Sequence, residues 1–307
     1  KGNKLKSENG AKITSSDDII ITSQNFEYDK IKNYLFLKKK VKINDKKNKT
    51  IINADKIFYD RSKEEIISYG KTKIFIDSDY VITTESIRFD RKLNIIFSET
   101  TTEIEDKDKN ILISKNIKFN INNKILKEKK VKINYIDGGK SSFESFFGNL
   151  NSKEFIGKDA KYFFSKKTFG NEDNDPRLYG NILERNDSKI ILSKGIFTTC
   201  KKREGCPPWK MKAEKVTHDK EKKIIDYKNA WLEFYDKPIL YFPKFFHPDP
   251  TVKRQSGFLI PTFGESGNSG SSVQIPYFKV ISDNKDTTFT PRIFTNKNIL
   301  FQNEYRK

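Results

Sequence analysis

A short phrase recurs through the first part of the chain and constrains the fold more than any other feature. An apolar residue, any residue, an aromatic residue and then Asp or Asn begin at Phe26, Ile57, Ile87 and Ile117, which are 31, 30 and 30 residues apart. A near copy, AEKVTHD at 213–219, repeats the earlier ADKIFYD at 54–60. A fixed period of about 30 residues predicts a stack of similar units that bury their apolar faces against one another.

Within each unit the apolar residues alternate with polar ones. Ile57 and Tyr59 alternate with Lys56, Phe58 and Asp60. This two-residue period predicts β-strands with one buried face. The phrases end in turn-forming residues, so we expect the side chains of Asp29, Asp60, Asp90 and Asp219 to stabilise Asx-type turns.

The inward phase of the repeat forms a continuous apolar stripe that could line a groove or could pack as an ordinary core. The arginines that follow two of the phrases, Arg61 and Arg91, are expected to face outward. The predicted groove-lining residues are Phe26, Tyr28, Val41, Ile43, Ile57, Tyr59, Ile74, Ile76, Ile87, Phe89, Ile104, Ile117, Phe119, Val131 and Ile133.

Composition narrows the possible partners. The 307 residues are 35% hydrophobic and 13% aromatic, which is enough for a core, and the net charge is +19. Such a charge indicates a nucleic acid, an anionic membrane surface or a phosphorylated lipid, or else a compositional bias toward Lys. A nucleic-acid-binding sheet needs aromatic residues exposed among its basic ones. Here the aromatics keep the apolar phase, so no nucleic-acid partner is expected.

The chain contains no motif that predicts catalysis, a cofactor or a metal centre, and we expect it not to be an enzyme. No secretory signal and no run of 18 apolar residues occur in it. Cys200 and Cys206 could bridge each other, bind metal or stay unpaired, although their C-x5-C spacing is not that of a zinc site. His218 takes the place of Tyr59 in the repeated phrase, which indicates a strand residue.

The pattern changes after residue 240. Residues 241–250 are rich in proline and aromatics, which favours an extended connection over a paired strand. Further on, apolar residues again alternate with polar ones. Val273, Ile275 and Tyr277 are expected on the face opposite to Gln274. Ile299, Phe301 and Tyr305 are expected on the face opposite to Gln302, Glu304 and Arg306. Strands of a membrane barrel show this pattern, as do half-buried strands of a soluble sandwich.

Six motifs then appear in a fixed order. They are GIFTTC at 195–200, W-x-M-x-A-E-x-V at 209–216, PILYFP at 238–243, RQSGFLIP at 254–261, PYF at 276–278 and TFTPR at 288–292. Residues 195–307 thereby resemble the outer-membrane lipopolysaccharide (LPS) assembly family LptD, also called organic solvent tolerance protein. The 30-residue repeat resembles the OstA-like periplasmic domain that this family shares with the bridge protein LptA.

The resemblance implies an all-β chain, with an elongated β-jelly roll, or β-taco, followed by the first strands of an antiparallel transmembrane β-barrel. It implies a tail at 1–20, a lipid-conducting domain at 21–243, a linker at 244–257 and the start of the barrel at 258–307. The N-terminal domain would lie in the periplasm and the barrel in the outer membrane. The implied partners are LPS, LptA and the plug lipoprotein LptE.

The resemblance also gives three residues expected roles. Pro261 and Pro276 match positions at the lateral gate, where lipid would leave the barrel sideways. Cys200 matches a cysteine that joins the two parts of the family's proteins by a disulfide, and Cys206 is a nearer candidate partner. The alternative is a soluble periplasmic LPS-binding bridge protein of the LptA type, in which residues 244–307 would extend a sandwich.

Overall fold

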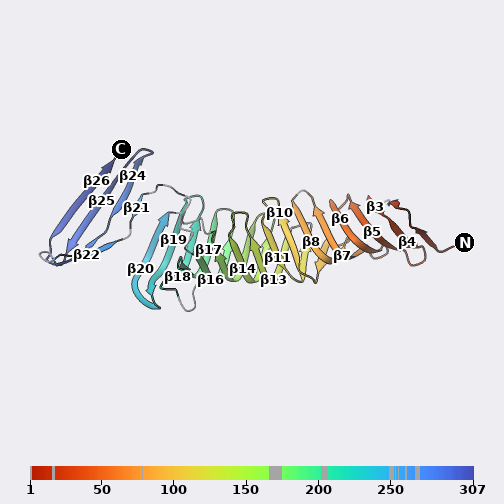
Figure 1. Ribbon diagram of the computed structural model, residues 1–307, viewed down its shortest axis with the longest axis horizontal. Coiled ribbons are helices and arrows are strands. Elements are labelled where there is room, and N and C mark those ends of the chain that lie inside the picture. Colours follow the sequence, from red (N-terminus) through yellow and green to blue (C-terminus); the bar gives the residue numbers. More distant parts are fainter. Residues whose placement is uncertain are drawn as a thin grey trace. The chain divides into compact units, whose positions relative to one another are not determined.

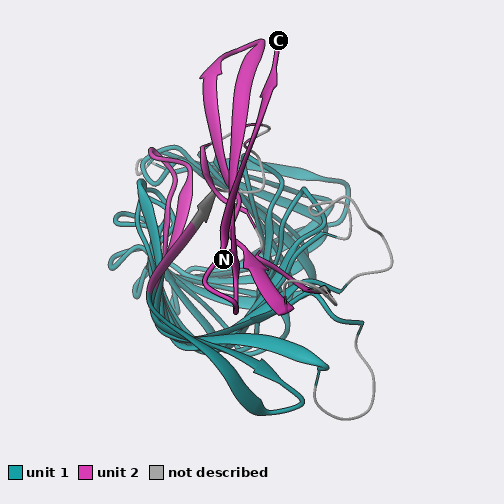
Figure 2. Cartoon of the chain, turned by 90° about the vertical axis from the view of Figure 1, so that its left-hand side faces the viewer, with its two compact units in different colours: residues 1–216, 228–243 teal, residues 217–227, 244–307 magenta. Residues whose placement is uncertain are grey.

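The computed structural model describes residues 2–15, 18–77, 79–165, 175–201, 207–248, 252, 254, 256–259, 261–266 and 270–307. Every regular element in these ranges is a β-strand, which confirms the all-β prediction. The same ranges contain no helix long and apolar enough to cross a membrane. The chain divides into two compact units, residues 1–216 with 228–243 and residues 217–227 with 244–307 (Figure 2).

The first sheet contains twenty strands, and each pairs with strands that are close to it in the chain (Figure 1). Several are halves of interrupted strands, such as β9 (Ile95–Ser98) and β10 (Thr102–Asp106), which pair with the two ends of β8 (Tyr80–Asp90). The strands are β1 (Lys4–Ser7), β2 (Ala11–Thr14), β3 (Ile19–Ser23), β4 (Asn25–Asp29), β5 (Tyr34–Asp45), β6 (Thr50–Asp60), β7 (Glu65–Ile76), β8 (Tyr80–Asp90), β9 (Ile95–Ser98), β10 (Thr102–Asp106), β11 (Ile111–Ser114), β12 (Ile117–Asn120), β13 (Ile125–Asn134), β14 (Lys140–Asn149), β15 (Glu154–Phe163), β16 (Arg177–Arg185), β17 (Lys189–Thr198), β18 (Trp209–Asp219), β19 (Ile224–Phe234) and β20 (Lys237–Pro248).

One 30-residue repeat corresponds to two antiparallel strands and two turns. The Oδ1 atom of Asp60 accepts hydrogen bonds from the backbone N–H groups of Ser62 (3.0 Å) and Lys63 (3.1 Å). Asp29, Asp90, Asp219 and Asn120 accept bonds of the same kind from the residues two or three positions later. The predicted Asx turns are therefore confirmed, and they fix the length of the repeat.

The long strands from β5 to β8 are bent near their middle, where the register of the ladder shifts. The register shifts between Lys38 and Val41 on β5, between Ala54 and Lys56 on β6 and between Tyr69 and Thr72 on β7. The bends lie beside one another on successive strands, so the whole sheet folds around a common interior (Figure 2). The turns at the two ends of the strands are thereby brought together along a line that we call the seam.

The second sheet contains β21 (Gly257–Phe258), β22 (Thr262–Ser266), β23 (Gly270–Gln274), β24 (Tyr277–Ser282), β25 (Lys285–Phe294) and β26 (Ile299–Arg306). Its two faces differ in polarity. Phe289 lies opposite Tyr277 on β24 and beside Phe301, whose ring stacks on it at 5.6 Å. On the other face Asp286 pairs with Arg306 at 2.8 Å. The register thus confirms the predicted alternation in this part of the chain.

Three local expectations differ from the structure. Residues 4–14, expected in a tail, form β1 and β2, which pair with β4 and β3; their polar sequence hides the alternation. Residues 241–248, expected as a connection, belong to β20, which pairs with β19. Arg91, expected to face outward, is 5% exposed, because a buried carboxylate lies within its reach.

Candidate functional site

The interior of the first sheet is lined by two rows of side chains that cross the strands. The first, which we call the aromatic row, runs from β5 to β13 through Leu35, Tyr59, Ile66, Phe89, Ile96, Phe119 and Leu126. The second, which we call the isoleucine row, runs from β3 to β13 through Ile21, Ile43, Ile52, Ile74, Ile82, Ile104, Leu112 and Ile133. None of these side chains is more than 8% exposed.

The structure places all fifteen predicted groove residues in this first sheet. Thirteen are buried, whereas Phe26 and Tyr28 are half-buried. These two residues lie on β4, near the N-terminal end of the sheet. The sequence analysis assigned only the later part of β7, at Ile74 and Ile76, and it missed Ile66 on the same strand and Ile96 on β9, which belong to the aromatic row. These strands lack the aromatic-Asp ending, and only their own alternation could have revealed them.

Contacts of Tyr80 join the two arms of the bent sheet. The rings of Tyr80, at the start of β8, and Phe119 lie 6.2 Å apart. Tyr80 also donates a hydrogen bond of 2.8 Å from its hydroxyl to the carbonyl of Leu150, at the opposite end of the strands. Burial raises the pKa of Tyr80 to about 12, so this hydroxyl keeps its proton at physiological pH.

A buried ion pair closes the seam near the N-terminal end. Arg91 Nε donates to Asp45 Oδ2 at 2.6 Å, and both side chains are at most 2% exposed. Its guanidinium also donates to the Tyr59 hydroxyl at 3.1 Å. Burial alone would lower the pKa of Arg91, but the hydrogen bond to Asp45 and the nearby Tyr59, Asp45 and Glu64 together outweigh burial, and the pKa is raised. The charge is therefore paired and bonded, as a buried charge must be.

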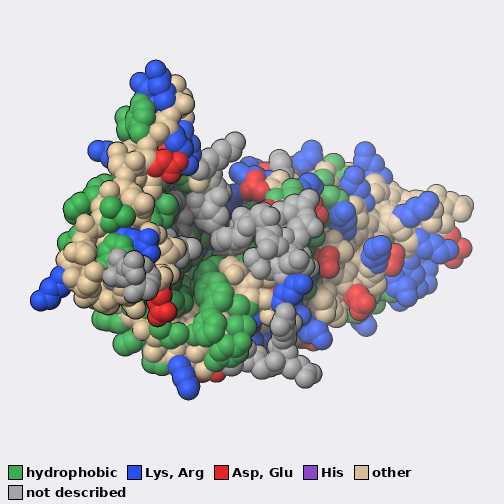
Figure 3. All heavy atoms as spheres, turned by 60° about the vertical axis from the view of Figure 1, so that its left-hand side comes forward, with side chains coloured by type: hydrophobic (Ala, Val, Ile, Leu, Met, Phe, Trp, Pro, Cys, Tyr) green, Lys and Arg blue, Asp and Glu red, His purple; other side chains and the backbone are tan. Residues whose placement is uncertain are grey.

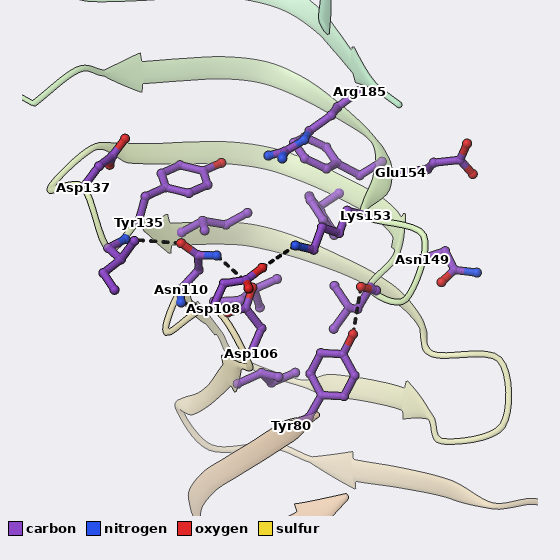
Figure 4. Close-up of a pocket in the computed structure, with 17 residues that line it drawn as sticks. Tyr80, Asp106, Asp108, Asn110, Tyr135, Asp137, Asn149, Lys153, Glu154 and Arg185 are labelled. Carbon is purple, nitrogen blue, oxygen red and sulfur yellow. Dashed lines mark hydrogen bonds and ion pairs between the residues drawn. The ribbon is translucent and has the colours of Figure 1, made fainter. Parts of the chain in front are cut away.

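A cavity of about 270 Å³ opens at the seam where β10, β13, β14 and β16 come together (Figure 4). Ile104, Leu112 and Phe155 form part of its apolar wall. At its rim Lys153 forms an ion pair with Asp108.

Arg185 continues the aromatic row at this cavity, opposite Phe155. Its Nε atom is buried and has no hydrogen-bond partner in the part of the chain that the structure describes. Beyond β13 the rows also include Ser141 and Gly148. The two rows thus change from apolar to mixed at this point.

The two prolines with expected roles lie at neighbouring interruptions of the second sheet. Pro261 stands between β21 and β22, and Pro276 stands between β23 and β24. The N–H of Leu259 donates to the carbonyl of Pro276 at 2.8 Å. The register of the two broken strands slips by one residue across this point, because Phe258 pairs with Tyr277 whereas Thr262 pairs with Gln274. Both features weaken the ladder locally.

Cys200 is half-buried after β17, and its carbonyl accepts a hydrogen bond of 2.5 Å from Arg177. Cys206 lies outside the described residues, so the pairing of the two cysteines stays a prediction. No cluster of three or more metal-binding side chains occurs among the described residues.

These features define a class of protein: a folded antiparallel sheet with an apolar interior, followed by a second sheet with one apolar and one polar face. Residues 226–307 match the family described as LptD protein. The resemblance to LptD is thereby confirmed.

Curated relatives named LPS-assembly protein LptD support the match. The one from Idiomarina loihiensis is 31% identical over 44% of this chain and 17% of its own length. The one from Nitrosospira multiformis is 26% identical over 79% of this chain and 22% of its own. The one from Methylococcus capsulatus is 39% identical over 39% of this chain and 11% of its own. The chain thus spans at most about a fifth of the length of these relatives.

Proposed function

We propose that this chain acts in the assembly of LPS at the outer membrane, the role that the names of its relatives give to those proteins. The observation that carries the proposal is the pair of unbroken apolar rows inside the first sheet. Each methylene removed from water contributes about 0.8 kcal/mol, so acyl chains between the rows would be held strongly. The interior is a path for lipid rather than a site for chemistry.

Acyl chains can enter this interior only if the two arms of the folded sheet separate, because Ile57 and Phe89 are fully buried. The seam is the place for such a movement. Side-chain contacts join the two arms there, including those of Arg91, Tyr80 and Lys153. We propose that lipid passes along the rows while the seam opens, with its sugar and phosphate head outside.

The second sheet would form the first strands of a membrane barrel, as part of a longer protein. Phe263 and Phe301 are 82% and 63% exposed on its apolar face, which suits contact with lipid chains. Figure 3 shows hydrophobic side chains gathered on parts of the molecular surface. Pro261 and Pro276 would weaken the strand pairing so that lipid can leave sideways. Residues 21–243 would be the periplasmic domain, reached by LptA, with LptE inside the barrel.

A soluble bridge protein of the LptA type accounts less well for the second sheet. A sandwich would have to cover the apolar face of β25 and β26, whereas Ile299 and Tyr305 are 57% and 55% exposed. The match of residues 226–307 to LptD also includes this sheet.

Site-specific photocrosslinking to LPS tests the proposal, in cells that carry the full-length protein. The probes replace Tyr59 and Phe89, which face the interior, and the matched controls replace Phe58 and Arg88, their outward-facing neighbours. Adducts at the interior pair alone would support the path. Equal labelling of both pairs, or none at all, would leave the rows as an ordinary core and refute it.

A further inference from the structure

A basic groove lies on the outer side of the first sheet, at the bend of the strands and away from the seam. It is about 1050 Å³ in volume and lies over β11, β13, β14 and β15. One carboxylate, that of Glu128, lines it. Its cationic residues are Lys115, Lys127, Lys129, Lys130, Lys132 and Lys158, all of which are exposed.

These six lysines differ from many others in the chain because they form no ion pair with any described residue. Lys4, Lys63 and Lys109, by contrast, each lie within 4 Å of a carboxylate. A cluster of six exposed ammonium groups without carboxylate partners has a positive potential that attracts anions.

The groove exists because the ladder is interrupted there. β13 pairs with β11 at Ile113 and Lys132 and with β12 at Phe119 and Leu126, but not in between. Side chains of the protein itself fill the gap. Glu128 accepts the backbone N–H of Lys118 at 2.5 Å, and Ser114 donates to the carbonyl of Lys129 at 3.1 Å. A peptide strand therefore finds no free edge to pair with, and recognition must come from side chains.

Two rows of outward side chains run side by side on β13, β14 and β15. In one, Ser145 lies between Lys129 and Lys158. In the next, Phe147 lies directly opposite Ile156. Phe147 is 48% exposed and Ile156 is 41% exposed. The rows are two residues apart along the strand, about 7 Å, so positive charge and apolar surface lie together.

We propose that this groove binds the phosphorylated head of an amphipathic lipid. The phosphate would lie between Lys129 and Lys158, whose ammonium groups suit it as mobile point charges. The first methylenes of the lipid would cover Phe147 and Ile156. A nucleic acid would need a series of exposed aromatic faces, and the groove offers only Phe147. The site lies outside the interior path and does not depend on it.

The test measures binding to the full chain in a non-ionic detergent at low ionic strength by titration calorimetry. The probes are dihexanoylphosphatidic acid, dihexanoylphosphatidylcholine, inorganic phosphate and hexaglutamate. The variants are K129Q/K158Q, F147S/I156S and the control K42Q/K73Q. Lys42 and Lys73 also face outward two strands apart, across the uncharged Asn53, but do not line this groove.

We expect K129Q/K158Q to weaken the binding of dihexanoylphosphatidic acid at least tenfold and K42Q/K73Q to change it less than twofold. F147S/I156S should weaken the binding of this lipid about fivefold and leave that of inorganic phosphate unchanged. Phosphatidylcholine should bind at least tenfold more weakly than phosphatidic acid. Equal effects of the two lysine pairs would overturn the proposal. So would phosphate that binds as tightly as the lipid, or hexaglutamate that binds in its place.

Discussion

The two sheets share the two-residue alternation of apolar and polar residues, but their apolar faces are buried to opposite extents. On the first sheet Ile57 and Phe119 are completely buried, because the strands bend and the sheet covers its own apolar face. On the second sheet Phe263 and Phe301 lie mostly exposed, since its described strands do not fold over this face. The pattern fixes which face is apolar, and the bend decides whether the protein itself covers that face.

The largest effect on the free energy of unfolding should come from creating a cavity in the interior of the first sheet. Phe119→Ala is expected to cost about 3–5 kcal/mol of unfolding free energy, because it leaves a cavity in a filled core. Phe301→Ala in detergent should cost far less, since its ring is 63% exposed. Urea denaturation followed by circular dichroism measures both. Similar losses at the two positions would remove the distinction between the sheets.

Breaking the buried ion pair should have an effect of comparable size. Asp45→Ala leaves the Arg91 charge without its main partner, which is expected to cost about 3–5 kcal/mol. The control is Glu105→Ala, which removes the exposed partner of Lys109 and should change little. The same denaturation experiment applies, and a small loss at Asp45 would show that the seam is not held there.

Glu128 gives a smaller effect that depends on pH. Burial raises its pKa from an ordinary 4.5 to about 7, although the hydrogen bond from Lys118 opposes the shift. The folded state therefore binds this proton more tightly, and the stability that it contributes is full below pH 4.5 and lost as the pH rises through 7. Glu128→Gln keeps an acceptor oxygen and carries no charge. It should be more stable than the parent by roughly 3 kcal/mol at pH 8 and equal to it at pH 4.

Thermal melting of the parent and the Gln variant at both pH values checks this expectation. A difference that is the same at pH 4 and pH 8 would show that the carboxyl does not titrate in this range.

The smallest effect concerns the turns that set the repeat. Asp60→Ala removes the acceptor for two backbone N–H groups and is expected to cost about 1 kcal/mol. Asp60→Asn keeps the acceptor and should restore most of the loss. Equal melting temperatures for all three proteins would mean that the turn forms without the side chain.

The repeat, the strand class and the two faces of the second sheet could be predicted because each depends on local spacing. The residues after the phrases, such as Arg91, could not be placed, because their partners lie in turns far away in the sequence, as Asp45 does. The bends were also hidden, since residues such as Lys39 and Lys130 take left-handed φ values of 61° and 54° without a glycine to mark them. The gap in the ladder that forms the basic groove depends on partners distant in sequence and on an unmarked bend, so it could not be predicted either.

Fluorescence quenching by brominated phospholipids most directly tests whether the apolar face of the second sheet contacts lipid while that of the first sheet is buried inside the protein. Tryptophan replaces Phe301 in one variant and Phe119 in another, with Trp209 and Trp231 changed to Phe, and the full-length protein is placed in vesicles. The account predicts strong quenching at position 301 and almost none at position 119. Equal quenching at the two positions, or none at 301, would contradict it.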